Sequence, residues 1–217
     1  MCGRFAITLP DQAMAGMLAA TPANDLPRVP NFNVCPTDPV HTVRSADGLR
    51  HLSAMRWGFV PLWYKTMADG PLLINARAET IAHKPAFREA VRARRCLIPA
   101  SGFYEWTKDE SGNRLPWYIQ PADDEALVFA GIWQDHGDAA PRNCAIVTTG
   151  ASQQMGAIHH RMPVILRPED WPLWLGEDGH GAARLMRPAP DGSLRMHRVS
   201  TSVNSNRASG AQLIDPA

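Results

Sequence analysis

Cys2 has the most distinctive chemistry in this sequence, because removal of Met1 turns it into an amino-terminal cysteine. An initiator methionine in front of a small residue is commonly removed. The α-amine has a pKa near ~8, against ~10.4 for a lysine amine, so roughly a tenth of it is neutral and nucleophilic at pH 7. Such an amine condenses with an aldehyde to an imine, and the adjacent thiol can then close on the imine carbon. Cys2 can therefore form a stable thiazolidine ring with an aldehyde.

The residues after Cys2 favour this chemistry over the plainer interpretation, in which Cys2 is only the first small residue of a strand. Gly3 leaves the backbone open to close approach. Arg4 places a forked cation beside the thiol, where it would favour the thiolate and bind a phosphate or a carboxylate.

Two polar groups stand within apolar stretches of the sequence. In LLINARAE, Asn75 and Arg77 would share one side of an extended segment, although an asparagine there is also typical of a turn or a sheet edge. Glu105 lies between Tyr104 and Trp106, where burial would raise its pKa and allow it to carry protons near neutral pH. If that strand is half exposed, Glu105 points to water instead.

A third group, AIHHRMPVIL, places two histidines and an arginine before a strand expected at Val164 to Leu166. Histidine is the usual proton carrier near neutral pH, and Arg161 is a second candidate phosphate ligand. In an extended segment His159 and His160 would face opposite ways, so only one of them could enter a site.

Five motifs in order resemble one family. They are MCGRFA, LINARAET, GFYEW, H-x-R-M-P and V-S-x-x-V-N, and they extend from Cys2 to the region of Asn204. Each motif is short, but the ordered set resembles the SRAP family of abasic-site processing proteins, also named SOS response-associated peptidases.

The resemblance implies a role for four residues. The Cys2 position forms the thiazolidine link to the ring-opened abasic sugar in single-stranded DNA and shields the lesion, and the Asn75 position orients that sugar. Glu105 matches the acid/base group, which is also implicated in autocatalytic removal of Met1 and in reversal of the crosslink. His159, the first residue of H-x-R-M-P, matches the catalytic histidine, and His160 occupies the variable position.

The resemblance also implies DNA contacts. The backbone-binding arginines match Arg4, Arg77 and Arg161, and the aromatic residues that wedge against bases match Trp63 and Tyr64. Stacking on a base contributes about 1–3 kcal/mol without sequence preference, which suits a lesion that has no base to read. For Trp63, ordinary core packing is the alternative.

Two other functions remain open from the residues alone. Glutamine amidotransferases also begin Met-Cys-Gly and use the cysteine as a nucleophile, but they share only those three residues. A non-covalent single-strand binder, with Cys2 incidental, would form a salt-labile complex equally well with intact DNA.

One residue departs from the family pattern. Family members often have a small residue before the proline of the N-V-x-P loop, and this chain has Cys35 there. Packing is the favoured interpretation of that thiol.

The composition limits the class of protein and the cofactors that it could bind. The 217 residues are 45% hydrophobic and 20% charged, with a net charge of +1, so the chain can bury one core and is not a polycation. The four scattered cysteines lack metal-ligand spacing, so we expect free thiols, no metal and no other cofactor. The sequence has no long apolar run and no secretory signal, and we expect a cytoplasmic monomer.

The elements that must position these residues are mostly strands. We expect a first strand in CGRFAITL, a helix in QAMAGMLAA, an irregular connection over 22–39, and a hairpin over 40–59 that turns at Asp47-Gly48. We expect a helix over 84–95, strands in CLIPASGFYEW, LPWYIQ, ALVFAGIW and NCAIVTTG, a short helix in RPEDWPLWL and a last strand in LRMHRVS. The predicted fold is α+β over 1–217: a single domain with a β-barrel-like core of bent antiparallel sheets, peripheral helices and a polar tail from about 208.

Overall fold

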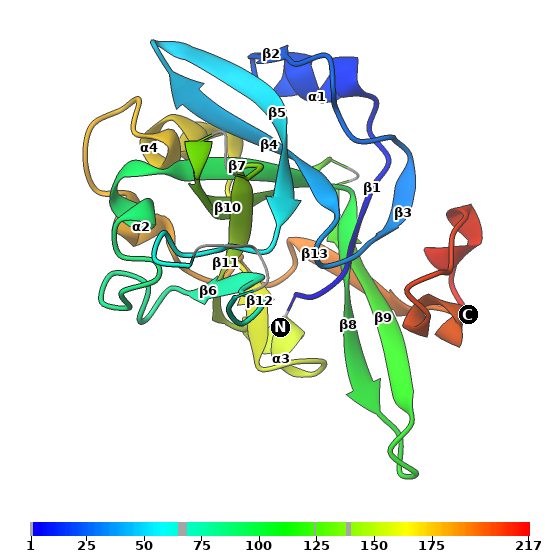
Figure 1. The fold of residues 1–217 in the computed structure, drawn as a ribbon. Coiled ribbons are helices and arrows are strands. Elements are labelled where there is room, and N and C mark those ends of the chain that lie inside the picture. Colours follow the sequence, from blue (N-terminus) through cyan, green and yellow to red (C-terminus); the bar gives the residue numbers. More distant parts are fainter. Residues whose placement is uncertain (1, 65–68, 124, 138–139) are drawn as a thin grey trace.

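The computed structural model describes residues 2–64, 69–123, 125–137 and 140–217, and in these residues two sheets form the fold (Figure 1). The five-stranded sheet has the order β13-β9-β8-β1-β3. Its strands are β1 (Phe5–Ile7), β3 (Asn31–Val34), β8 (Gly102–Lys108), β9 (Arg114–Pro121) and β13 (Leu194–Arg198). The eight-stranded sheet contains β2 (Ala20–Pro22), β4 (Pro39–Ala46), β5 (Leu49–Trp57), β6 (Asn75–Arg77), β7 (Arg95–Ala100), β10 (Leu127–Gln134), β11 (Asn143–Gly150) and β12 (Arg161–Pro163).

The eight-stranded sheet closes on itself. Strands β11, β10, β7, β4 and β5 are neighbours in that order, and β5 then pairs with β11 in parallel, Arg56 opposite Asn143 and Trp57 opposite Cys144. Most pairings are antiparallel, but β2 on β5 and β6 on β11 are also parallel. The predicted α+β fold, a single domain with a barrel-like core, is confirmed.

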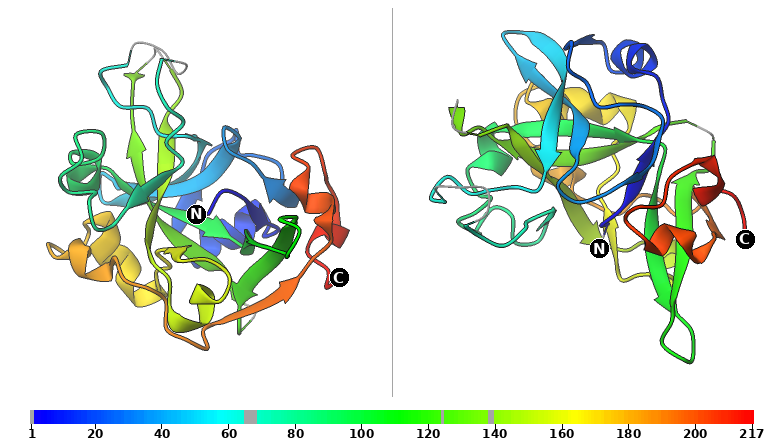
Figure 2. Two further views of the ribbon diagram at one scale, coloured as in Figure 1. Left: turned by 90° about the horizontal axis from the view of Figure 1, so that it is seen from below. Right: turned by 45° about the vertical axis from the view of Figure 1, so that its right-hand side comes forward.

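The core lies between this ring and the five-stranded sheet. Phe5 on β1 contacts Trp57 on β5 edge-on, with ring centroids 5.1 Å apart, and Phe129 on β10 at 6.0 Å. All three rings are buried. The amino-terminal segment is therefore anchored in the middle of the molecule, as the view from below shows (Figure 2, left).

The hairpin of β4 and β5 turns at Asp47 and Gly48, as predicted. Both residues have positive φ, 53° and 74°, which two-residue hairpin turns require and which glycine adopts without strain. This hairpin carries Trp57, whose indole Nε1 donates to the carbonyl of Ile74 at 3.0 Å and so places the start of β6.

The helices are few, short and peripheral: α1 (Asp11–Met17), α2 (Ala90–Ala93), α3 (Gln153–Gly156) and α4 (Trp171–Leu175). The predicted first helix and the short helix in RPEDWPLWL are confirmed. The helix predicted over 84–95 is wrong in length, because only α2 is regular. Residues 85–89 form turns, because the carbonyl of Lys84 is shared between the N–H of Phe87, three residues on, and that of Arg88, four residues on.

Two strands differ from the prediction for the same reason, which is pairing with distant segments. The connection predicted as irregular over 22–39 contains β3, which pairs with β1. The strand expected at Val164 to Leu166 is wrong: the strand here is β12, which ends at Pro163 and pairs with β11, and Ile165 forms only an isolated bridge with Phe129. The sequence pattern of a segment does not indicate which distant strand it pairs with.

The segment predicted as a polar tail from about 208 is packed. Leu213 is buried, Val199 forms a bridge with Pro216, and the backbone N–H of Ala217 donates to the carbonyl of Arg198 at 2.9 Å. In the part of the chain that the structure describes, no helix has the length and apolar character needed to cross a membrane.

Candidate functional site

Cys2 and Asn75 are in direct contact. Cys2 is fully buried just before β1, and the Nδ2 of Asn75, the first residue of β6, donates to its carbonyl oxygen at 2.8 Å. β6 is held beside β11, with Asn75 opposite Ile146. Ala76 is buried while Arg77 is exposed, which confirms the predicted extended segment. The Oδ1 of Asn75 is buried and has no hydrogen-bond partner among the described residues, so it remains available as an acceptor.

Glu105 faces Cys2 from β8. Its side chain is buried at 3% exposure, which raises its pKa above the usual range, as the sequence predicts. Burial also raises the pKa of the Cys2 thiol, and the negative charge of Glu105 raises it further. The expectation that the Arg4 cation would favour the thiolate is therefore wrong: Arg4 lowers the pKa of the thiol only through a backbone hydrogen bond, burial has the larger effect, and the thiol stays protonated at neutral pH.

His159 joins Glu105 at one cleft of about 330 Å³. The cleft is lined by Gly3, Arg4, Glu105, Trp106, Thr107, Lys108, Arg114 and His159. α3 places the histidine: Ser152 caps this short helix by accepting from the N–H of Met155, and the N–H of His159 then donates to the carbonyl of Met155 at 3.0 Å. The structure thus brings together Cys2, Asn75, Glu105 and His159.

The two histidines do not face opposite ways. Their rings stack with centroids 4.4 Å apart and an interplanar angle of 26°, because the chain turns here and is not extended. His159 is half-buried and lines the cleft, whereas His160 is exposed. Burial lowers the pKa of His159, so its imidazole is neutral at pH 7.

Arg4 points into the protein. Its Nη1 donates to Asn33 Oδ1 at 2.6 Å and to the carbonyl of Val203 at 3.0 Å, and its Nη2 donates to Asn206 Oδ1 at 2.7 Å. Only 7% of the residue is exposed. Arg4 therefore ties the start of the chain to its end, and its contact with DNA stays a prediction.

Arg4→Ala is expected to lower the free energy of unfolding by about 2–3 kcal/mol, because it removes charge-assisted hydrogen bonds and leaves buried acceptors unpaired. Urea denaturation measures the effect. Arg77→Ala, at an exposed position, is the control and should change stability by less than about 0.5 kcal/mol. An Arg4→Ala protein as stable as the wild type would contradict this structural role.

The other two predicted arginines differ from each other. Arg161 is buried, and its two terminal nitrogens contact the carboxylate of Glu79 at 2.7 and 3.0 Å. Arg77 is exposed two residues after Asn75, and its charge lowers the pKa of His160, after the larger effects of His159 and burial. Arg77 is thus accessible to a ligand, and phosphate contact by either arginine stays a prediction.

Trp63 and Tyr64 lie on the connection between β5 and β6. The Trp63 side chain is 57% exposed and its ring centroid lies 6.0 Å from that of Tyr64. The alternative of core packing for Trp63 is therefore wrong. The ring borders another hollow, with Arg88 and Arg94, so base stacking by Trp63 would occur outside the cleft of Glu105.

Aromatic and cationic side chains that the sequence did not predict as site residues form the rim of the cleft. The guanidinium of Arg114 on β9 lies 4.4 Å from the ring centroid of Trp106, and that of Arg4 lies at 5.9 Å. The indole Nε1 of Trp106 donates to Asn204 Oδ1 at 2.6 Å. The pairing of β8 with β9 creates this stack, and only the motif residues Trp106 and Asn204 gave a signal for it.

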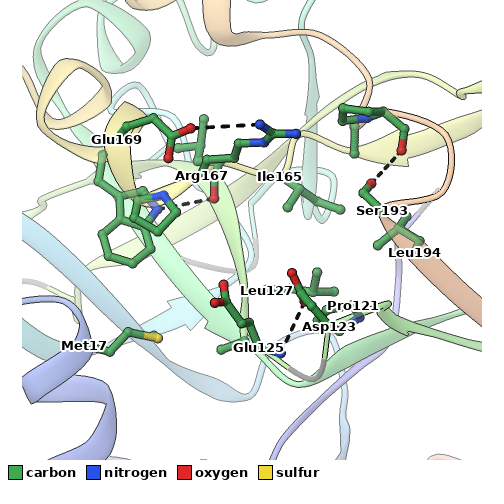
Figure 3. A pocket seen from close by; sticks show the side chains of 16 residues that line it. Met17, Pro121, Asp123, Glu125, Leu127, Ile165, Arg167, Glu169, Ser193 and Leu194 are labelled. Atoms are coloured by element: carbon green, nitrogen blue, oxygen red, sulfur yellow. Dashed lines mark hydrogen bonds and ion pairs between the residues drawn. The ribbon is translucent and has the colours of Figure 1, made fainter.

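A larger cleft of about 660 Å³ lies elsewhere and has a different chemistry (Figure 3). Its described lining includes none of the nine predicted site residues. Three carboxylates, Asp123, Glu125 and Glu169, border it, against the single cation of Arg167. This anionic border does not suit a phosphate backbone, and the smaller cleft beside Cys2 is the candidate site.

No group of three or more His, Cys, Asp or Glu side chains in the described ranges is arranged to hold a metal ion. The four cysteines are free thiols, as expected. The chemistry available at the site is therefore that of a buried cysteine beside a carboxyl of raised pKa, a neutral imidazole and an amide.

These features define a class of protein in which a buried cysteine near the start of the chain lies beside a carboxyl of raised pKa and close to an imidazole. The family model described as SOS response associated peptidase (SRAP) matches residues 1–206. The chain belongs to the SRAP family, which confirms the resemblance drawn from its motifs.

Relatives and a solved structure agree with this assignment. Abasic site processing protein YoaM of Bacillus subtilis is 35% identical over 192 residues, covering 86% of this chain and 85% of that protein. Abasic site processing protein YedK of Escherichia coli is 33% identical over 227 residues, covering 100% of both. The crystal structure of a Bacteroides thetaiotaomicron protein has a TM-score of 0.86 at 24% identity, covers 100% of both chains, and supports the fold.

Proposed function

We propose that this protein recognises abasic sites in single-stranded DNA and forms a thiazolidine crosslink through Cys2 after Met1 is removed. Met1 itself lies outside the described residues. The observation that carries the proposal is the convergence on Cys2: Asn75 holds its carbonyl at 2.8 Å, and Glu105, buried beside it, shares a cleft with His159. The names of the relatives, abasic site processing proteins, agree with a DNA lesion as substrate.

The first step joins the α-amine of Cys2 to the aldehyde of the ring-opened abasic sugar. The nitrogen attacks the carbonyl carbon, and loss of one water leaves a C=N bond. The thiol sulfur then adds to that carbon while its proton ends on the nitrogen, which closes the five-membered ring. The net reaction releases one water and requires no oxidant or reductant.

Three side chains near Cys2 would each assist a step of this reaction. Glu105, with its raised pKa, can take a proton from the amine or thiol and return it to the leaving oxygen near neutral pH. The neutral imidazole of His159 donates a hydrogen bond to the sugar or its oxygen. Asn75 fixes the Cys2 backbone, so that the amine and thiol approach the same carbon.

Two further activities follow from the same groups. Glu105 can assist hydrolysis of the Met1–Cys2 bond, which makes the protein its own peptidase. Before the ring closes, the imine acidifies the neighbouring carbon of the sugar, so slow strand cleavage by β-elimination accompanies crosslinking. DNA binding beyond the cleft is supported by the exposed Trp63 and Arg77.

The test uses three single-stranded DNAs: one with an abasic site, one with an intact base, and one with a reduced abasic site that lacks the aldehyde. Wild-type protein, shown by intact mass to lack Met1, should give an adduct stable on a denaturing gel only with the first. No stable adduct would refute the proposal. A salt-labile complex with all three DNAs would favour the non-covalent binder, and glutaminase activity, which we expect to be absent, would favour the amidotransferase.

A further inference from the structure

One ion pair next to the site has no part in the chemistry above. Glu79 and Arg161 meet in a two-pronged contact, with Arg161 Nη1 2.7 Å from Glu79 Oε1 and Arg161 Nη2 3.0 Å from Glu79 Oε2. The Arg161 side chain is only 11% exposed and that of Glu79 is 51% exposed. Burial of the cation makes this pair more rigid than an ordinary surface ion pair.

The pair connects the two segments that carry Asn75 and His159. Glu79 follows β6 by two residues, and Arg161 begins β12. β6 and β12 both pair with β11: Thr148 of β11 lies opposite Arg77 of β6 and opposite Pro163 of β12. The ion pair therefore joins the two outer segments across β11.

Thr148 completes this arrangement. Arg161 Nη2 donates to the carbonyl oxygen of Thr148 at 2.8 Å and lies 3.2 Å from its Oγ1. The backbone N–H of Ala78, next to Glu79, donates to the same carbonyl at 2.8 Å. β11 thus serves as the common support for the arginine and for the segment that carries the carboxylate.

The backbone of Arg161 also determines which nitrogen of His159 carries the proton. The Arg161 N–H donates to His159 Nδ1 at 2.9 Å. Nδ1 lies 3.1 Å from the Arg161 carbonyl as well, but a backbone N–H can only donate, so Nδ1 must accept and the proton of the neutral ring sits on Nε2. A shift of the Arg161 backbone would release this constraint.

We propose that Glu79 is a positioning residue for the crosslinking site: by binding Arg161 it holds β12 and the segment after β6 in place on β11 and keeps His159 in the tautomer with the proton on Nε2. The inference rests on the proposed function of Cys2. Since Glu79 neutralises the cation that DNA would otherwise attract, its loss should slow the reaction without weakening DNA binding.

The test measures crosslinking rate against concentration of abasic single-stranded DNA for Glu79→Ala and Glu79→Gln. The maximal rate should fall about tenfold for Glu79→Ala and less for Glu79→Gln, which keeps one hydrogen-bonding arm, while the half-saturating DNA concentration stays equal or falls. Glu177→Gln is the matched control, because Glu177 forms a similar two-pronged pair with Arg50, at 2.6 and 2.9 Å, outside the cleft. Its rate should equal that of the wild type.

Nitrogen-15 NMR of the histidine rings gives a readout that does not depend on crosslinking. The His159 signals, assigned with His159→Asn, should show the Nε2-protonated tautomer in the wild type and a mixture in Glu79→Ala. An unchanged rate and tautomer in both Glu79 variants would overturn the positioning role of Glu79, as would a raised half-saturating concentration at unchanged maximal rate. A wild-type protein that forms no adduct would refute the proposed function instead, and the NMR comparison would still decide on the positioning role.

Discussion

Cys2→Ala is expected to abolish the adduct that survives a denaturing gel, with at least about a 100-fold loss of stable product. The variant keeps an α-amine at residue 2 once Met1 is removed, so it can still form the imine, but it has no thiol to close the ring. Treatment with borohydride, which reduces an imine to a stable amine, should therefore still trap protein on abasic DNA. The two gels, with and without reductant, separate the contribution of the amine from that of the thiol.

Cys35→Ala is the matched control for the loss of a thiol. Cys35 is half-buried, and its Sγ donates to the carbonyl of Asn33 at 3.3 Å, as a packed side chain does. Its removal should leave the adduct unchanged. A Cys2→Ala protein that still gave a stable adduct without reductant would show that another nucleophile forms it. Loss of the adduct in Cys35→Ala would place the second thiol in the chemistry.

Glu105→Gln is expected to lower the crosslinking rate by about 10²- to 10⁴-fold, because the amide cannot carry a proton. The wild-type rate should rise with pH in two steps, one through the raised pKa of Glu105 as the carboxylate forms, and one through the pKa of the α-amine, near ~8. Glu105→Gln should lose the first step and keep the second. Initial rates between pH 4.5 and 9 measure both.

A measurement of protein stability distinguishes a loss of proton transfer in Glu105→Gln from misfolding of the variant. A carboxyl whose pKa is raised on folding adds stability below its unfolded pKa, and that stability is lost as the pH rises through the folded pKa. Above that pKa the buried carboxylate destabilises the folded state. Glu105→Gln has no such charge, so at pH 7–8 its free energy of unfolding should equal or exceed that of the wild type. A strongly destabilised Glu105→Gln protein, or one with an unchanged rate and pH profile, would contradict the proton-transfer role.

Local sequence signals predicted the elements whose partners are close in the chain. The turn at Asp47-Gly48 and its flanking alternation define the β4–β5 hairpin, since both turn residues need positive φ. The alternation around Asn75 likewise predicted β6, with Ala76 inward. The raised pKa of Glu105 followed from its apolar neighbours, because burial in that setting favours the neutral form whatever the wider topology.

Predictions that depended on distant partners fared worse. β3 is a strand because it pairs with β1, and nothing in residues 22–39 alone indicates that pairing. His159 and His160 stack because α3 ends in a turn, whereas the predicted extended segment would have separated them. The Arg4 cation, predicted to favour the Cys2 thiolate, instead bonds to Asn33, Val203 and Asn206, of which the last two lie far away in the sequence.

The sequence by itself determined the family, because family membership depends on motifs in a fixed order, and the same motifs gave the candidate reactive groups: Cys2, Asn75, Glu105 and His159. Only the tertiary structure decided the protonation of these groups and the strands that hold them in place. Burial holds Cys2 as a thiol and His159 as a neutral ring, and desolvation depends on every segment packed around a group. The pairing of β6 and β12 with the same strand, β11, brings Glu79 and Arg161 together across 82 residues of chain, a contact that no local pattern contains.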